Sequence, residues 1–175
     1  MTVVPTLESI SGLLVFQIAG IEFCTDLKLI TGIKKTAEVK CNSGGLIDTS
    51  DNHNYLLIEF SNLFNLKVKK KTESTRVLLL EVYGNAISFF VDKVTAIISL
   101  DKIFIENSID IKPCNNINYV SSVLTIQDCN YYFPDYGEIS KEISNSVQMA
   151  NNFTRGKIIY PSMPITLNFS EKIQD

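Results

Sequence analysis

The chain contains 175 residues with a formal net charge of −3, and 45% of its residues are hydrophobic against 20% charged. This composition excludes an intrinsically disordered chain, and the pI of about 5.2 excludes a basic nucleic-acid-binding protein. The length suits one domain or two small lobes packed together. No apolar run approaches the roughly 20 residues that span a bilayer, and no basic residue precedes the first apolar residues. We therefore expect a cytoplasmic protein.

The first predicted element is a β-hairpin close to the N-terminus. Residues 13–18 form an apolar run, Ala19-Gly20 supplies a turn, and residues 21–24 return with apolar and polar alternation. Gly20 suits the positive φ that a tight hairpin turn requires. Two antiparallel strands are therefore predicted here.

A second hairpin repeats this design later in the chain. Residues 77–82 and 86–91 are its strands, and Gly84 in the connection follows Gly20 by 64 positions. Each return strand is followed by an aspartate and then by an apolar pair three residues apart. These residues are Asp26 with Ile30 and Ile33, and Asp92 with Val94 and Ile97. The shared order indicates an internal repeat.

Two further segments resemble one another in the same order. Residues 55–60 and 131–136 are β runs that contain an acid, Glu59 or Asp135, four residues before an apolar side chain. We expect each acid to stand at the start of a helical turn, because negative charge is favourable at a helix N-terminus.

These repeats predict one unit of roughly 65–75 residues used twice. The predicted units are a domain at 1–150, its pseudo-repeats at about 12–66 and 76–140, and a C-terminal extension at 151–175. Apolar residues at three- and four-residue spacing predict a helix from Gly137 to about Ala150. The extension contains two possible extra strands, at 157–160 and 165–169.

The sequence offers few groups for catalysis. It contains no nucleophile elbow, phosphate-binding loop or zinc-protease motif, so we predict a protein that is not an enzyme and has no cofactor or metal. The single histidine, His53, shares a polar loop with Asp48 and Asp51, which leaves a small hydrolytic or ligand-binding barrel as one alternative. Turn formation by the two aspartates is the favoured interpretation.

Two other polar features have more than one interpretation. The lysine-rich connector at 67–75 indicates either an anionic partner or lipid headgroup, or a solvated loop, which we favour for a run of this length. The cysteines lack the close pairs of a zinc site, which predicts structural or buried free thiols. They are Cys24, Cys41, Cys114 and Cys129.

Five segments carry motifs in a fixed order, at 14–24, 26–33, 45–47, 56–63 and 87–97. The first has the sequence LVFQIAGIEFC, the fourth LLIEFSNL, and the fifth, which is the most specific, ISFFVDKVTAI. Together they resemble the CheW-like domain of bacterial chemotaxis. That family includes the free coupling protein and the regulatory domain of the chemotaxis histidine kinase. The resemblance covers roughly residues 12–143.

The resemblance implies a mainly all-β fold: two SH3-like five-stranded β-barrels that share a core, with a short C-terminal helix. It also implies a non-catalytic adaptor that couples a chemoreceptor cytoplasmic tip to a histidine kinase regulatory domain through protein contacts, with no nucleic acid and no membrane insertion. The residues at the family's partner-binding positions are Ile30, Gly32, Ile33, Gly45, Ser50, Asp51 and Ile97.

The chain departs from the family pattern in one loop. Where the family has Asn-Leu-Arg-Gly, which helps to form the receptor-facing groove, the sequence is Asp48-Thr49-Ser50-Asp51. A serine cannot replace the multidentate hydrogen bonds of an arginine. The alternative is therefore a CheW-like binding module that recognises a different protein outside chemotaxis through the loop at 44–54.

Overall fold

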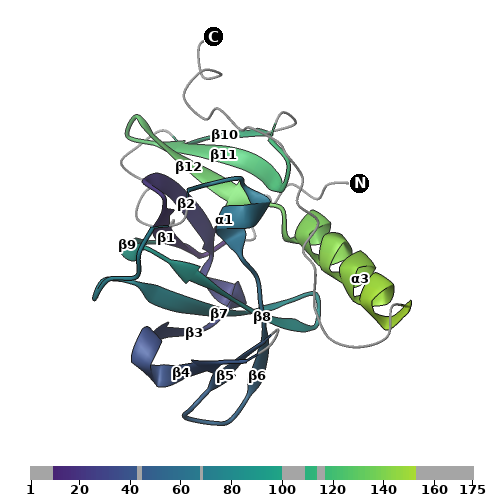
Figure 1. Ribbon diagram of the computed structural model, residues 1–175. Coiled ribbons are helices and arrows are strands. Elements are labelled where there is room, and N and C mark those ends of the chain that lie inside the picture. Colours follow the sequence, from purple (N-terminus) through teal and green to yellow (C-terminus); the bar gives the residue numbers. More distant parts are fainter. Residues whose placement is uncertain (1–9, 43–44, 68, 100–108, 114–116, 153–175) are drawn as a thin grey trace.

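The computed structural model describes residues 10–42, 45–67, 69–99, 109–113 and 117–152, and these residues form two mixed β-sheets and a C-terminal helix (Figure 1). Sheet A has the order β10-β11-β12-β2-β1-β9, and sheet B has the order β3-β7-β8-β6-β5-β4. The strands of sheet A are β1 (Gly12–Ile18), β2 (Ile21–Asp26), β9 (Lys93–Ser99), β10 (Ile109–Pro113), β11 (Val120–Ile126) and β12 (Cys129–Pro134). Those of sheet B are β3 (Ile30–Lys35), β4 (Val39–Cys41), β5 (Gly45–Asp48), β6 (Asn54–Leu57), β7 (Arg76–Val82) and β8 (Asn85–Val91).

Both predicted hairpins are present, with turns of the same conformation. The β1–β2 turn places Ala19 at φ 54° and Gly20 at φ 89°, and the β7–β8 turn places Tyr83 at φ 49° and Gly84 at φ 76°. Two consecutive residues with positive φ define the type I′ turn, whose twist matches that of the flanking strands. The positive φ at Gly20 and Gly84 therefore explains why both turns, 64 positions apart, contain a glycine.

The two halves of the chain exchange their hairpins. The β1–β2 hairpin pairs with β9 and β12 from the second half, whereas the β7–β8 hairpin pairs with β3 and β6 from the first half. The two sheets have equivalent strand orders when each element is replaced by its counterpart in the other half. Each sheet has six hydrogen-bonded strands among the described residues, one more than the five predicted for each barrel.

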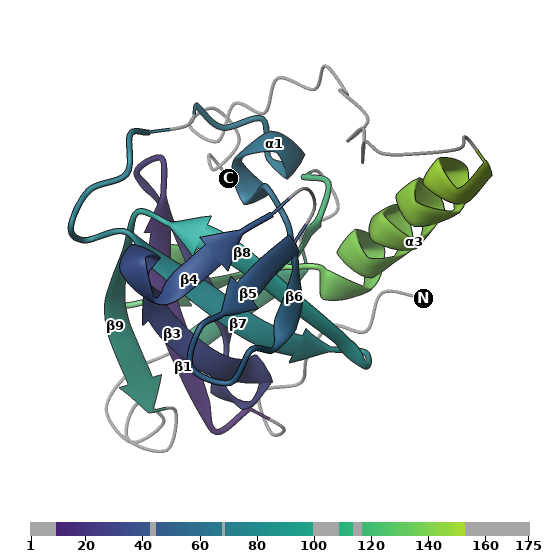
Figure 2. The ribbon, with the colours of Figure 1, turned by 60° about the horizontal axis from the view of Figure 1, so that its bottom comes forward.

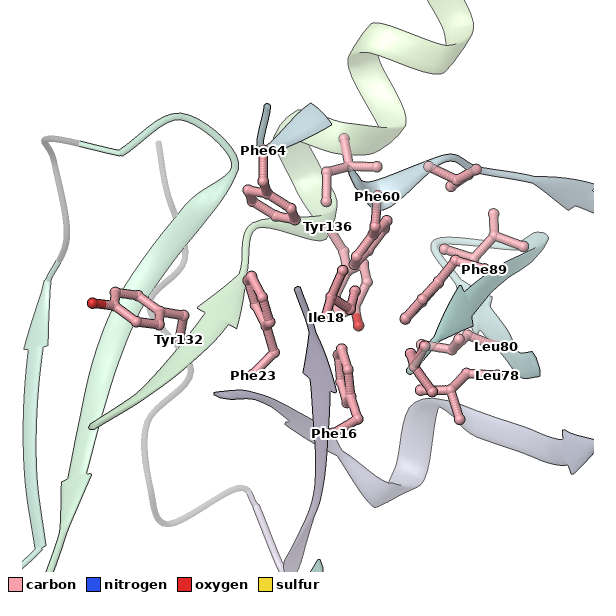
Figure 3. Close-up of a cluster of buried hydrophobic side chains, with 14 of the residues drawn as sticks. Phe16, Ile18, Phe23, Phe60, Phe64, Leu78, Leu80, Phe89, Tyr132 and Tyr136 are labelled. Carbon is pink, nitrogen blue, oxygen red and sulfur yellow. The ribbon is translucent and has the colours of Figure 1, made fainter. Parts of the chain in front are cut away.

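A single large hydrophobic cluster, called here the shared core, joins the two sheets (Figure 3). Its fully buried members include Phe16 and Phe23 of sheet A and Phe89 of sheet B. Two smaller clusters fill the individual sheets: one contains Leu13 and Val15, the other Val77 and Leu79. The mainly β fold of two SH3-like units around a common core is therefore confirmed.

Two strands supply both kinds of cluster because their side chains alternate between faces. On β1, Phe16 faces the shared core, and Val15 faces the smaller cluster of sheet A. On β7, Leu78 faces the shared core, and Leu79 faces the smaller cluster of sheet B. Strands buried on both faces are apolar throughout, which accounts for a substantial part of the high hydrophobic content.

The two acids predicted to start helical turns behave differently. Asp135 accepts a hydrogen bond from the backbone N–H of Glu138 at 3.0 Å, and thereby caps helix α3 (Tyr136–Asn152). Glu59 stands at the start of the short helix α1 (Phe60–Leu63), but its side chain makes no capping hydrogen bond. Aspartate is a preferred capping residue, since its short side chain reaches the first backbone N–H groups. Both acids therefore stand at the start of a helical turn as predicted, but only Asp135 caps its helix with its side chain.

Helix α3 is attached to sheet A by a buried tyrosine. The Tyr136 hydroxyl donates a hydrogen bond of 3.0 Å to Thr25 Oγ1 of β2, and both residues are buried. Burial raises the pKa of the Tyr136 hydroxyl above its ordinary value, so this group stays protonated.

Replacement of this tyrosine tests the attachment of α3. We expect Tyr136→Phe to lower the free energy of unfolding by about 1–2 kcal/mol, because it leaves the buried Thr25 hydroxyl without this partner. Tyr83→Phe is the matched control, since Tyr83 is 73% exposed. Urea unfolding followed by circular dichroism measures both. Equal stability of the two variants would contradict a stabilising role for the Tyr136 hydrogen bond.

The remaining predictions have mixed outcomes. The predicted C-terminal helix is present and extends to Asn152. Cys24 is a buried free thiol as expected, whereas Cys41 and Cys129 are free but exposed, because one lies at the end of the short strand β4 and the other next to the β11–β12 turn. Cys114 and the possible strands at 157–160 and 165–169 lie outside the described residues.

Candidate protein-binding site

Two exposed isoleucines stand on the edge strands of the two sheets. Among the described residues, the large hydrophobic side chains that are exposed are Ile33 at 40%, Ile97 at 64% and Tyr83 at 73%. Ile33 lies on β3, the first strand of sheet B, and Ile97 lies on β9, the last strand of sheet A. Figure 2 shows β3 and β9 on the same side of the molecule. An edge strand with an exposed apolar side chain is a template for contact with another protein.

The two isoleucines occupy equivalent positions of the repeat. Ile33 is paired with Leu78 across β3 and β7, and Ile97 is paired with Leu14 across β9 and β1. Each member of the first pair is related to the corresponding member of the second by 64 positions, the spacing of the hairpin glycines. The molecule therefore presents the same kind of apolar edge twice.

The other residues at the partner-binding positions lie mainly around β3. Ile30 and Gly32 are half-buried on β3, and Gly45 is half-buried on β5 of the same sheet. Ser50 and Asp51 are exposed in the β5–β6 loop. Six of the seven predicted residues thus belong to sheet B and its loops, whereas Ile97 belongs to sheet A.

A lysine of β3 holds the β5–β6 loop against this edge. Lys34 Nζ lies 3.0 Å from Asp48 Oδ2 and donates a hydrogen bond to Ser50 Oγ at 3.1 Å. Asp48 Oδ1 also accepts hydrogen bonds from the Ser50 backbone N–H at 2.9 Å and from Ser50 Oγ at 2.8 Å. Sequence reasoning did not single out Lys34. The feature that could have indicated its role is its position on the inward face of β3, between the exposed Ile33 and Lys35.

Both charges of this pair are stabilised by the folded structure. The Ser50 backbone N–H and then Lys34 lower the pKa of Asp48, against the opposing effect of its burial. The hydrogen bond to Asp48 raises the pKa of Lys34. The aspartate therefore stabilises the fold above its ordinary pKa of 3.8, and this stabilisation is lost as the pH falls through the lower folded value.

The pH dependence of the melting temperature should show how much the Lys34–Asp48 pair stabilises the fold. We expect the melting temperature of Asp48→Asn to fall less than that of the unaltered protein between neutral pH and about pH 3, because the variant has no carboxylate to protonate at this position. Lys34→Met should be intermediate, since the Ser50 hydrogen bonds to Asp48 remain. Differential scanning fluorimetry across the pH range measures the three curves. Parallel curves for Asp48→Asn and the unaltered protein would contradict the argument.

The polar loop does not assemble a catalytic group in the described part of the chain. Asp48 is held by Lys34 and Ser50, while Asp51 accepts a hydrogen bond from the His53 backbone N–H at 2.9 Å. The His53 ring instead packs edge-on against Tyr55, with 4.8 Å between ring centroids. Both aspartates accept from a backbone N–H two residues ahead, so the turn-forming interpretation is confirmed.

Two general features of the described residues complete this geometry. They contain no helix with the length and apolar character needed to cross a membrane. Among the same residues, no three His, Cys, Asp or Glu side chains gather where they could hold a metal ion.

The architecture is a CheW-like fold, two SH3-like units around a shared core. The scaffolding protein TtCheW from Thermoanaerobacter tengcongensis has a similar crystal structure, with a TM-score of 0.58 over 71% of this chain and 88% of that chain. The two sequences are 15% identical over the match, so the similarity defines the fold. No protein-family model matches the sequence, and no curated protein matches it.

Proposed function

We propose that this protein is a non-catalytic adaptor of chemotaxis-type signal transduction, which couples a chemoreceptor tip to the regulatory domain of a histidine kinase. The observation that carries this proposal is the pair of exposed isoleucines, Ile33 and Ile97, at equivalent places on two sheet edges. Apolar anchors surrounded by polar residues are typical of protein interfaces. A fold shared with a scaffolding protein supports the same conclusion.

In this proposal, the two edges bind different partners in the same way. Ile97 and Ile33 each enter an apolar pocket of a partner, and backbone groups at the outer edges of β9 and β3 add polar contacts. Ile30, Gly32 and Gly45 shape the surface next to Ile33, and Ser50 and Asp51 form its polar rim. Residues 1–150 act as the binding unit, with 151–175 as an extension. We place the protein in the cytoplasm, where the kinase and the receptor tips lie.

The Lys34–Asp48 pair favours a second candidate, a CheW-like module that binds a different protein. The β5–β6 loop carries Asp48-Thr49-Ser50-Asp51 at the place of the Asn-Leu-Arg-Gly motif, and Lys34 fixes its conformation from within. The surface next to Ile33 then offers the exposed Ser50 hydroxyl and the exposed Asp51 carboxylate instead of a guanidinium. Such a surface selects a donor-rich or basic partner segment.

Isothermal titration separates the two candidates. The full chain is titrated with the kinase regulatory domain and, separately, with a chemoreceptor cytoplasmic tip from the same organism. The adaptor proposal expects binding of both partners. Binding of neither at high micromolar concentration would overturn the kinase and receptor partnership and favour the second candidate. The gene neighbourhood gives an independent check, since the adaptor proposal expects chemotaxis genes nearby.

A further inference from the structure

We propose that residues 165–169 of this chain add as a strand to the outer edge of β9 and cover Ile97. This segment lies outside the described residues, and its sequence is Ile-Thr-Leu-Asn-Phe. Ile97 is 64% exposed on the last strand of sheet A. The contact itself is independent of the proposed function, whereas its consequence, competition with the partner that binds Ile97, rests on that function.

The segment has the sequence pattern of a strand with one apolar face. Ile165, Leu167 and Phe169 alternate with two polar residues, and in a strand every second side chain lies on the same face. Pro164 directly precedes the segment, at a position where a strand tolerates the missing backbone N–H. No charged residue occurs from Ile158 to Ser170. A strand of this kind is stable only when its backbone pairs with a sheet edge and its apolar face is covered.

The exposed side of β9 continues an apolar row that begins in the shared core. Leu14 of β1 is a fully buried member of that core and is the cross-strand partner of Ile97. Cross-strand partners carry their side chains on the same face of the sheet, so Ile97 is the outermost residue of this row. A strand with Leu167 opposite Ile97 extends the row by one more apolar side chain. The contact is favourable because it removes the exposed apolar surface of Ile97 from water.

The other edge strands are less suitable for an uncharged segment. β3 has an equivalent exposed isoleucine, but Lys35 stands two positions from Ile33 on the same face, and an apolar neighbour would cover part of this charged side chain. The corresponding neighbours of Ile97 are Thr95 and Ser99, which are uncharged. β4 has three residues, and β10 includes two charged residues and a proline. Charge and strand length therefore favour β9.

The chain between α3 and this segment is long enough to reach β9. Helix α3 ends at Asn152, and residues 153–164 connect it to the segment. In an extended conformation this connection spans up to about 40 Å, which is comparable to the width of a domain of this size. Because the segment is tethered, its effective concentration at β9 is on the order of millimolar, so a weak contact suffices to hold it there.

Hydrogen–deuterium exchange of the full chain tests the contact without any partner protein. We expect Leu167→Asp to accelerate exchange of the β9 amides by about tenfold, because a carboxylate is unfavourable in the apolar row and the added strand is lost. Thr166→Asp is the matched control. It adds the same charge one position away, on the opposite face of the strand, and should leave β9 exchange unchanged. Mass spectrometry of peptides that cover β9 and β3 measures each edge separately.

Four results would each overturn the inference. Equal β9 exchange in the unaltered chain and in Leu167→Asp would show that the segment does not cover this edge. Equal acceleration in both aspartate variants would assign the effect to charge alone. Acceleration at β3 instead of β9 would place the segment on the other sheet. Protection of β9 that appears only as the protein concentration rises would assign the contact to a second copy of the chain.

The competition with a partner is measured separately by isothermal titration. If the segment covers β9 in about nine molecules of ten, Leu167→Asp should raise the affinity of the partner at this edge by about tenfold, and Thr166→Asp should not. Unchanged affinity in Leu167→Asp would overturn the competition. A failure of the kinase and receptor titrations would leave the exchange measurements unaffected, so the contact and the proposed function fail separately.

Discussion

Replacing Phe60 by alanine is expected to lower the free energy of unfolding by about 3–5 kcal/mol, the largest effect of any change considered for this protein. Phe60 is 1% exposed and its ring stacks on that of Phe89, with 3.8 Å between centroids and 6° between planes. It also contacts Phe64 edge-on and faces Tyr136 (Figure 3). One ring thus connects α1, sheet B and α3, and its removal leaves a cavity that these rigid elements cannot fill.

Chemical denaturation of the single variants and of a double variant measures this effect. Phe89→Ala should cost a similar amount, and a double-mutant cycle should show a coupling of about 0.5–1.5 kcal/mol, because the rings are in contact. Tyr83→Ala is the control for removal of an aromatic ring from an exposed turn, and should cost much less. Loss of less than about 1 kcal/mol in Phe60→Ala would argue against a single core shared by the two sheets.

Changing Ile97 to aspartate is expected to weaken binding of the partner at the β9 edge by at least about 30-fold, without changing the melting temperature. The side chain is 64% exposed, so the folded protein loses little by the substitution. In the proposed complex it enters an apolar pocket, where a carboxylate without a partner would be desolvated. Ile33→Asp should have the same effect at the β3 edge.

The comparison between the two edges makes this prediction specific. Titration calorimetry with each partner should show that Ile33→Asp and Ile97→Asp affect different complexes, because the two residues lie on different sheets. Tyr83→Asp is the control, since it places the same charge on an exposed apolar residue in a turn. Unchanged affinities in both isoleucine variants would remove the edge strands from the proposed interface while leaving the fold assignment intact.

The hairpins, the C-terminal helix and the capping role of Asp135 could be predicted from the sequence because each depends on neighbouring residues. A type I′ turn needs only Gly20 or Gly84 and its predecessor, and the α3 pattern needs only apolar residues at helical spacing. The equivalence of Ile33 and Ile97 could also be predicted, since the two residues follow the same spacing.

The exchange of hairpins and the Lys34–Asp48 pair could not be predicted in this way. Strands β1 and β7 are apolar on both faces, so their alternation does not show which strands they join. The pairing of β12 with β2 rests on one register position, Tyr132 opposite Phe23, which are more than 100 residues apart. Lys34 and Asp48 likewise meet through the closure of sheet B, and no local pattern links them.

The exchanged hairpins also determine the order in which the chain can fold as it is synthesised. All strands of sheet B are available once β8 ends at Val91, whereas sheet A needs β12, which ends at Pro134. Before β12 is available, the β1–β2 hairpin exposes apolar side chains, and the backbone edge of β2 has no partner strand from sheet A. Nascent chains associate through such surfaces. Strands β1 and β2 thus leave the ribosome well before the strand that covers them, and this interval is when they are most prone to aggregate.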